Sequence, residues 1–315
     1  MTTFKEIRGQ LIKSVSSDPS PAAAGDMWYN STSQTLKGVV LTGAWSSGEV
    51  LANARQALAA AGTQTAALAF GGRLPGNSPT GITEEYDGTN WANSNALNTA
   101  RFQVAGAGTQ TAGLAFGGTP TTADSEEYNG TSWTEGNNLN TARGSLAGAG
   151  IQTAALAFGG GDGTESYNGT SWTALATMNT ARVGIAGAGT STAALGFGGE
   201  GPAPSYTLYN VSEEWNGSSW SEGNNLNTAR QQAGGSGIQT AALAFGGQNP
   251  ARALTEEYDG TSWTEIADMS TARYSLAGNG TASAALASGG NLGPSNTAAV
   301  EEFSLVATTK TFTTS

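Results

Sequence analysis

The 315-residue sequence contains neither cysteine nor histidine. This removes disulfides, thiolate nucleophiles, imidazole bases and the commonest zinc and copper ligands. Charged residues are also scarce, at 12% of the chain against a typical share of about 25%. Most familiar catalytic and metal-binding arrangements are therefore excluded, and we expect neither a metal site nor a cofactor.

Long apolar segments are likewise absent. No stretch approaches the roughly 20 apolar residues that a membrane-spanning helix needs. No apolar run follows the basic residues Lys5, Arg8 and Lys13, so we expect no secretory signal. The net charge of −11 comes from scattered carboxylates, which disfavours binding to nucleic acid or to anionic membranes.

Glycine, in contrast, is abundant, with 46 residues, about twice its usual share of ~7%. Many glycines and few charges suit short strands joined by tight turns, and argue against long surface helices. Chains of this length commonly form one domain when they are built as a propeller or a barrel. The composition therefore predicts an all-β protein.

A six-fold repeat runs from Arg55 to about Phe303. Each unit starts with an arginine, and a Gly-Gly pair begins 16 residues later. An aromatic residue follows, and in five units a tryptophan stands five residues after it and ten residues before the next arginine. The repeated arginines are Arg55, Arg101, Arg143, Arg182, Arg230 and Arg273. The period of 39 to 48 residues is long enough for four strands of about 5 to 6 residues each, with turns.

The second unit illustrates the four strands, which we name A to D from the centre outward. Phe102–Gly108 is small and Ala/Gly-rich, as expected for a crowded strand A near an axis. Strand B is Thr111–Phe116 and ends at a glycine pair, where only glycine fits an unusual φ or a close backbone approach. Strand C ends at Tyr128, and the Asn129-Gly130 turn predicts a hairpin into strand D around Trp133.

This order of features resembles the kelch motif: a strand ending in Gly-Gly, a Glu-x-Tyr-Asp/Asn strand, a tryptophan, an apolar Leu or Met, and an arginine. The resemblance covers roughly residues 44 to 304 and implies a β-propeller. The apolar positions are Leu51, Leu97, Leu139, Met178, Leu226 and Met269. A propeller of the WD type fits less well, because Gly-His and Trp-Asp never occur. We therefore predict a kelch-like β-propeller of six four-stranded blades.

The sixth unit lacks the tryptophan and hence its strand D. Trp45 stands ten residues before Arg55, which predicts that residues 44–50 form a strand D without a blade of its own. We expect this strand to complete the blade that begins at Arg273, because such closure removes a sheet edge. The segment Thr308–Thr314 is a competing closing strand. The alternative architecture is a seventh, composite blade built from residues 27–49 and the C-terminal tail.

Two domains follow from this interpretation: an N-terminal arm, linker and start of a hairpin over residues 1–34, and the propeller over residues 35–315. Ser16–Gly25 is rich in Ser, Pro and Ala and is typical of a linker. The segment Gly25–Thr32 then begins a hairpin towards Leu36–Leu41.

The stretch from Ile7–Gln10 through Leu36–Gly38 resembles N-terminal modules of marine bacteriophage tail and virion structural proteins. The resemblance covers about 35 residues and implies an attachment peptide or arm. The competing interpretation is a disordered start followed by an extra edge hairpin.

The repeated arginines and a repeated glutamate are the most prominent charged residues. The glutamate lies two positions before each aromatic residue, at Glu84, Glu126, Glu165, Glu213, Glu256 and Glu301. Catalysis needs one asymmetric site, so a pair present in every unit is expected to be structural. We predict Arg–Glu pairs inside or between blades, with Arg143 against Glu126 or a similar carboxylate and the arginines also bonded to carbonyls.

Adjacent Glu-Glu pairs could suggest the acid and base of a glycoside hydrolase. Neighbouring residues of a strand point to opposite faces, so these carboxylates cannot share a site. The tryptophans and tyrosines are expected to pack between blades.

The loops that join strands B and C differ in length and content among the units, whereas the A–B and C–D turns are nearly invariant. Loops on a rigid scaffold commonly carry recognition. The candidate binding residues are Arg73, Tyr206, Tyr209 and Arg252, because Arg and Tyr are enriched at interaction hot spots. The competing interpretation is that these loops merely tolerate random changes of sequence and length. Gln110 and Gln152, in A–B turns, are expected at the surface on the other face.

The first functional hypothesis is a non-enzymatic bacteriophage virion protein, on a tail fibre, baseplate or capsid surface, that uses the propeller as a binding head or a spacer. Its partners would be other virion proteins or a host cell-surface glycan or protein, with no nucleic acid and no membrane insertion, and it could form a homo-oligomer. The alternative is a cytoplasmic kelch-like scaffold that binds a protein. A glycan hydrolase that uses carboxylates alone is the third hypothesis.

Overall fold

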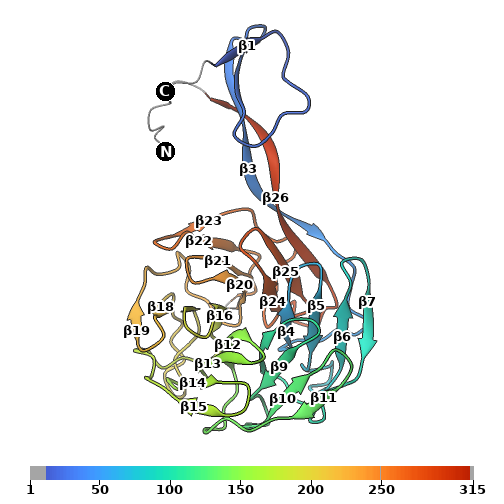
Figure 1. Ribbon diagram of the computed structural model, residues 1–315, viewed down its shortest axis with the longest axis vertical. Coiled ribbons are helices and arrows are strands. Elements are labelled where there is room, and N and C mark those ends of the chain that lie inside the picture. Colours follow the sequence, from blue (N-terminus) through green and yellow to red (C-terminus); the bar gives the residue numbers. More distant parts are fainter. Residues whose placement is uncertain (1–11, 249, 313–315) are drawn as a thin grey trace. The chain divides into compact units, whose positions relative to one another are not determined.

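A computed structural model describes residues 12–248 and 250–312 (Figure 1). The segment Ile7–Gln10, part of the phage-like resemblance, lies outside them. All regular structure within these ranges is β-strand, and no helix there could span a membrane. The chain divides into two compact units, a smaller one of Met1–Ala44 with Leu305–Ser315 and a larger one of Trp45–Ser304. The predicted all-β class is confirmed, and the fold resembles a β-propeller.

Five antiparallel sheets of four strands lie in the larger unit, each in the order of the chain. The first contains β4 (Ala59–Gly62), β5 (Ala67–Phe70), β6 (Thr83–Tyr86) and β7 (Trp91–Ser94). The second contains β8 (Ala105–Gly108), β9 (Gly113–Phe116), β10 (Ser125–Tyr128) and β11 (Trp133–Glu135). The third contains β12 (Leu146–Ile151), β13 (Ala154–Gly159), β14 (Thr164–Tyr167) and β15 (Trp172–Ala174). The fourth contains β16 (Ala186–Gly189), β17 (Ala194–Phe197), β18 (Ser212–Trp215) and β19 (Trp220–Glu222). The fifth contains β20 (Gly234–Ile238), β21 (Ala241–Phe245), β22 (Thr255–Tyr258) and β23 (Trp263–Glu265).

The sixth sheet has six strands in the order β1-β2-β3-β26-β25-β24. Its strands are β1 (Lys13–Val15), β2 (Met27–Asn30), β3 (Thr35–Ser47), β24 (Ala277–Gly280), β25 (Ala284–Ser288) and β26 (Val300–Phe312). Within the larger unit, the end of β3 that carries Trp45 lies beside the first residues of β26, and the amide of Gly48 donates to the carbonyl of Val300 at 2.9 Å. An N-terminal strand and three C-terminal strands are thereby joined in one sheet.

The innermost strands β4, β8, β12, β16, β20 and β24 contact one another in cyclic order, and the sheets of the larger unit surround a common centre (Figure 1). Small residues permit this approach. A Cβ on Gly148 would lie 2.5 Å from the carbonyl oxygen of Gly106, and a Cβ on Gly106 would lie 2.7 Å from the ring of Phe70. The Ala/Gly-rich composition of strand A follows from this crowding.

Aromatic side chains join neighbouring sheets at five of the six junctions. Trp133 packs against Phe70 of the preceding sheet with ring centroids 4.9 Å apart, and its Nε1 donates to Thr83 Oγ1 at 3.0 Å. The same indole-to-hydroxyl bond joins Trp172 to Ser125, Trp220 to Thr164, Trp263 to Ser212, and Trp45 to Thr255. Trp45 thus does for the sixth sheet what four of the repeated tryptophans do for theirs. In the first sheet, Trp91 instead stacks on Tyr86 of the same sheet, and its buried Nε1 has no hydrogen-bond partner among the described residues.

The smaller unit is organised around one carboxylate. Asp18 accepts hydrogen bonds from Trp28 Nε1, Asn30 Nδ2 and Lys37 Nζ at 2.7 to 2.9 Å. These bonds, that of Lys37 foremost, lower the pKa of Asp18 to about 2. The hydrogen bonds tie the Ser16–Gly25 connection to β2 and β3, which pair antiparallel with Trp28 opposite Lys37.

Candidate functional site

Each repeated arginine forms a buried ion pair with the glutamate of its own repeat. Arg55 pairs with Glu84, and the other pairs are Arg101–Glu126 at 2.9 Å, Arg143–Glu165 at 3.2 Å, Arg182–Glu213 at 2.8 Å, Arg230–Glu256 at 3.0 Å and Arg273–Glu301 at 3.2 Å. Arg143 therefore pairs with Glu165 and not with Glu126, because strand C of the same sheet brings its carboxylate to the arginine that precedes strand A.

These ion pairs also bind the backbone. Arg182 Nη1 donates to the carbonyls of Gly198 at 2.9 Å and Val211 at 2.7 Å, and Glu213 Oε2 accepts from the amide of Asn179 at 2.7 Å. Burial lowers the pKa of the Arg182 guanidinium, and the Glu213 charge opposes this shift. Each pair thus fixes the B–C loop and the D–A connection of its sheet and is part of the framework.

The second glutamate of the Glu-Glu pairs connects neighbouring sheets. Tyr258 donates its hydroxyl to Glu214 of the preceding sheet at 2.6 Å, and Tyr86 donates to Glu302 at 2.6 Å. Tyr128 donates to Glu85 and Tyr167 to Glu127 in the same way. The two adjacent carboxylates therefore face different partners, as the alternation of a strand requires.

The tyrosine–glutamate bond is absent at two junctions. Between the third and fourth sheets both residues differ: Ser166 stands in place of the glutamate, and Trp215 in place of the tyrosine. Between the fifth and sixth sheets only one changes: Glu257 remains, but Phe303 has no hydroxyl to donate. Burial raises the pKa of Glu257.

The four predicted binding residues lie in the B–C loops of three different sheets. Tyr206 and Tyr209 share the loop of the fourth sheet; Tyr206 is 62% exposed, whereas Tyr209 is half-buried and its amide donates to Gly199. Arg73 and Arg252 are half-buried and belong to the first and fifth sheets, which are not neighbours in the ring.

Arg73 already has an intramolecular partner. Its guanidinium carbon lies 5.0 Å from the centroid of the Phe102 ring, in the geometry of a cation–π contact. The amide and the carbonyl of Arg73 both pair with Gln56. Among the four candidates, Tyr206 is therefore the side chain that is most available at the surface.

The mouth of the central ring is a feature that sequence reasoning missed. Six equivalent residues, each two positions after a repeated arginine, have a left-handed backbone with φ between 53° and 62°. They are Ala57, Gln103, Ser145, Gly184, Gln232 and Ser275. This conformation costs roughly 1 kcal/mol or more for a residue other than glycine, so it persists only where the surroundings impose it.

A closed ring of backbone hydrogen bonds imposes this conformation. The amide of each of the six residues donates to the carbonyl of the equivalent residue in the preceding sheet, and the amide of Ala57 donates to Ser275 to complete the ring. The six distances lie between 2.7 and 3.1 Å. Because these six amides donate within the ring, the donors that it offers a ligand at the mouth are side chains.

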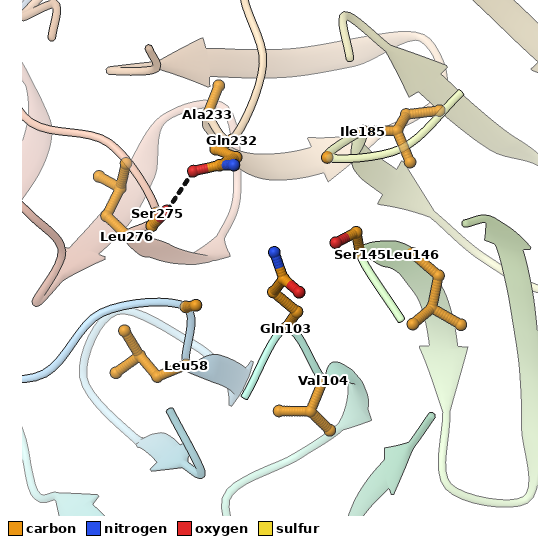
Figure 2. Close-up of a pocket in the computed structure, with 12 residues that line it drawn as sticks. Leu58, Gln103, Val104, Ser145, Leu146, Ile185, Gln232, Ala233, Ser275 and Leu276 are labelled. Carbon is orange, nitrogen blue, oxygen red and sulfur yellow. Dashed lines mark hydrogen bonds between the residues drawn. The ribbon is translucent and has the colours of Figure 1, made fainter. Parts of the chain in front are cut away.

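A cavity of about 110 Å³ opens at this mouth, and Figure 2 shows the side chains around it. Its polar side chains come from Gln103, Ser145, Gln232 and Ser275, and apolar residues such as Leu58 and Ile185 complete the lining. Around the ring the six residues read Ala, Gln, Ser, Gly, Gln, Ser. The two glutamines therefore come from opposite sheets, as do the two serines, which gives the mouth an approximate two-fold symmetry.

Neighbouring hydroxyls orient both glutamine amides. Thr119 Oγ1 donates to Gln103 Oε1 at 2.9 Å, and Ser275 Oγ donates to Gln232 Oε1. The amide nitrogen of Gln103 points towards the centre of the cavity in Figure 2. Since the carbonyl oxygens accept these bonds, the NH₂ groups are the donors available to a ligand, although Gln232 Nε2 also lies 3.5 Å from Gln231 Oε1.

The expectation that Gln110 and Gln152 are surface side chains is wrong. Gln152 Nε2 donates to the carbonyls of Gly113 at 2.9 Å and Tyr128 at 2.7 Å, both in the preceding sheet. Gln110 makes the equivalent bonds to Ala67 and Tyr86. These side chains therefore reach across the junction and bond the backbone of the preceding sheet.

The fold and the site together define a β-propeller-like repeat protein with a neutral, polar mouth. Over residues 12–248 and 250–312, no group of three or more acidic side chains could hold a metal ion. Comparison of the sequence with protein-family models finds no match, and neither does comparison with curated proteins.

Proposed function

We propose that the larger unit is a kelch-like β-propeller of six blades, in which β3 supplies strand D of the last blade. The six Arg–Glu pairs, the cyclic contacts of the innermost strands and the six-membered ring of hydrogen bonds support this blade count. The bond from Trp45 to Thr255 supports the role of β3. The seven-blade alternative would need residues 27–49 and the C-terminal tail to form a separate sheet, whereas β2, β3 and β26 belong to the sheet of β24 and β25.

We further propose that the chain is a non-enzymatic binding and structural module of a bacteriophage virion. One observation carries the assignment to a binding class: the charged residues present in every repeat pair with each other inside their own sheet. The variable B–C loops and the mouth are then the surfaces on which the repeats differ. Placement in a virion, on a tail fibre, baseplate or capsid surface, rests on the resemblance of the N-terminal segment.

The alternative functions make different demands on these residues. A hydrolase using carboxylates alone is the least supported, because in the Glu84-Glu85 pair the first carboxylate binds Arg55 and the second binds Tyr128. A cytoplasmic scaffold would use the same loop surface as a virion protein. The place where the chain is found, in virus particles or in the cytoplasm, therefore distinguishes these two hypotheses better than the structure does.

Mass spectrometry of purified virus particles tests the placement. We expect peptides of this chain at a fixed ratio to the major structural proteins after particles are purified on a density gradient. Recovery of the chain only from the soluble fraction of infected cells, bound to one protein partner, would favour the scaffold instead.

Binding to host cells tests the loop surface. In one variant Arg73, Tyr206, Tyr209 and Arg252 are changed to alanine, and we expect it to bind host cells at least tenfold less than the unchanged chain. Because Gln110 and Gln152 are structural, the matched control is Ile151→Ser with Ile238→Ser, two residues 54% exposed beside the A–B turns. Loss of binding in the control alone would place recognition on the opposite face.

A further inference from the structure

The geometry of the mouth points to a binding site for a neutral saccharide, whose adjacent hydroxyl groups enter the cavity between Gln103 and Gln232. This inference rests on the proposed binding function and names the ligand class and the contacts. It differs from the loop-surface hypothesis because none of the four loop residues lines this cavity.

The available donors select for oxygen acceptors. The Oε1 atoms of Gln103 and Gln232 accept bonds from Thr119 and Ser275, so the donors left on these two opposite side chains are their NH₂ groups, of which that of Gln232 also donates to Gln231. The hydroxyl of Ser145 can both donate and accept. A sugar hydroxyl matches this set, because its oxygen can accept from an amide while its hydrogen is donated to Ser145.

The absence of charge on the lining selects for a neutral ligand. None of the twelve residues that line the cavity is ionisable. A carboxylate or ammonium group would lose hydration here without gaining a charged partner, which is unfavourable. A uronic acid, or another sugar whose charge enters the cavity, is therefore expected to bind more weakly.

The volume limits how much of the sugar enters. The cavity of about 110 Å³ is small beside the pockets of about 300–1,000 Å³ that enclose drug-sized ligands. A two- or three-carbon edge with its hydroxyls fits that space, and the rest of a sugar ring would remain outside, over the loops. Glycerol, a neutral triol of that size, is the smallest probe with the required groups.

Rigidity of the mouth favours recognition. The four polar side chains are attached to a closed hydrogen-bonded ring, so their backbone positions are fixed before a ligand arrives. Preorganisation of this kind lowers the entropy that binding must offset. The left-handed residues other than glycine are consistent with this role, because strained backbone clusters at ligand sites.

The experiment is an NMR titration of the full chain with four neutral probes: glycerol and the methyl glycosides of glucose, galactose and mannose. We expect at least one probe to shift the side-chain amide signals of Gln103 and Gln232. We expect glycerate, whose carboxylate would have to enter a cavity that takes up glycerol, to bind about tenfold more weakly than glycerol. Gln103→Leu with Gln232→Leu should weaken binding about tenfold or more, as expected when one or two hydrogen bonds are lost.

Two further variants separate a binding role from a structural one. Gln103→Glu with Gln232→Glu keeps the size of both side chains but removes the NH₂ donors, and should also lose binding. Gln248→Leu, on the same face but outside the cavity lining, should bind as the unchanged chain does. Binding is compared only among variants whose melting temperatures match that of the unchanged chain.

The proposal is overturned if no neutral probe moves the two amide signals, or if the leucine and glutamate variants bind as well as the unchanged chain. These outcomes are distinguishable from failure of the proposed function. A chain found in particles that ignores all four probes overturns the saccharide site alone. A chain absent from particles that binds a probe through Gln103 and Gln232 overturns only the placement in the virion.

Discussion

At the scale of single residues, the repeats act as a set of natural controls, because five or six copies of a contact show what each position contributes. The junction between the fifth and sixth sheets keeps Glu257 but replaces the donor tyrosine by Phe303. Phe303 is buried and lies 5.3 Å from the Trp45 ring, measured between centroids. The last junction is therefore the one with an unmatched carboxylate.

We expect Phe303→Tyr to stabilise the protein by about 0.5–1.5 kcal/mol, the net contribution of one hydrogen bond. The new hydroxyl would supply Glu257 with the donor that Glu214 receives from Tyr258. Urea unfolding measures the change, and a double-mutant cycle with Glu257→Ala, which has no acceptor, provides the control. If Phe303→Tyr is stabilising to the same extent when Glu257 is replaced, the gain does not come from this bond.

The tyrosine–glutamate bonds also predict a response to alkaline pH. Burial and the Glu85 carboxylate raise the pKa of Tyr128 to about 12, above its usual value near 10. The folded state therefore holds this proton more tightly than the unfolded chain does. The stabilisation that this bond contributes is complete below pH 10 and is lost as the pH rises from about 10 to 12. The decline measured by urea unfolding should be shallower in Tyr128→Phe, and an equal slope in both proteins would contradict the assignment.

The buried ion pairs give a prediction that tests their framework role. Arg143→Ala leaves the Glu165 carboxylate buried without its cation, and should lower the free energy of unfolding by about 3 kcal/mol or more. Arg143→Met combined with Glu165→Leu should recover much of the loss, because an apolar pair has no unpaired charge. Unchanged melting of Arg143→Ala together with lost ligand binding would make Arg143 a binding residue.

At the scale of elements, spacing in the sequence predicts the strands but not the bonds between sheets. The expected strand Thr111–Phe116 is observed as Gly113–Phe116, and the hairpin at Asn129-Gly130 joins β10 to β11. These features depend on local alternation and turn chemistry, which are visible in one repeat. The bonds of Gln152 and Tyr128 to the preceding sheets depend on how sheets pack, so no local pattern shows them.

The glutamine bonds between sheets can be tested by two adjacent residues. Gln152→Ala removes two hydrogen bonds to the carbonyls of Gly113 and Tyr128, and should lower the free energy of unfolding by about 1–3 kcal/mol. Ile151→Ala, at the next residue, removes a 54% exposed side chain and should change it by less than about 0.5 kcal/mol. Equal effects of the two substitutions in thermal or urea unfolding would refute the bridging role of Gln152.

At the scale of the whole chain, the ring creates a cavity that no single repeat contains. The residues at the mouth differ among repeats, so periodicity gives no signal for them, although their fixed offset from each arginine is visible in the sequence. Their left-handed backbone follows from a hydrogen-bonded ring that needs all six innermost strands. The repeat pattern predicts the framework of Arg–Glu pairs and the variable loops, but it does not predict the residues at the mouth.

Closure of the larger unit by an N-terminal strand leads to the last prediction. Deletion of residues 1–50 removes β3, and with it Trp45, whose indole bonds Thr255 and packs against Phe245 and Phe303. The unpaired edge of β26 and the exposed aromatic rings should then cause aggregation or loss of cooperative unfolding. Deletion of residues 1–24 keeps β3 whole, so the larger unit should remain folded and melt cooperatively. Calorimetry and size-exclusion chromatography compare the two proteins. A soluble, cooperatively melting product of the larger deletion would show that β3 is not needed for closure.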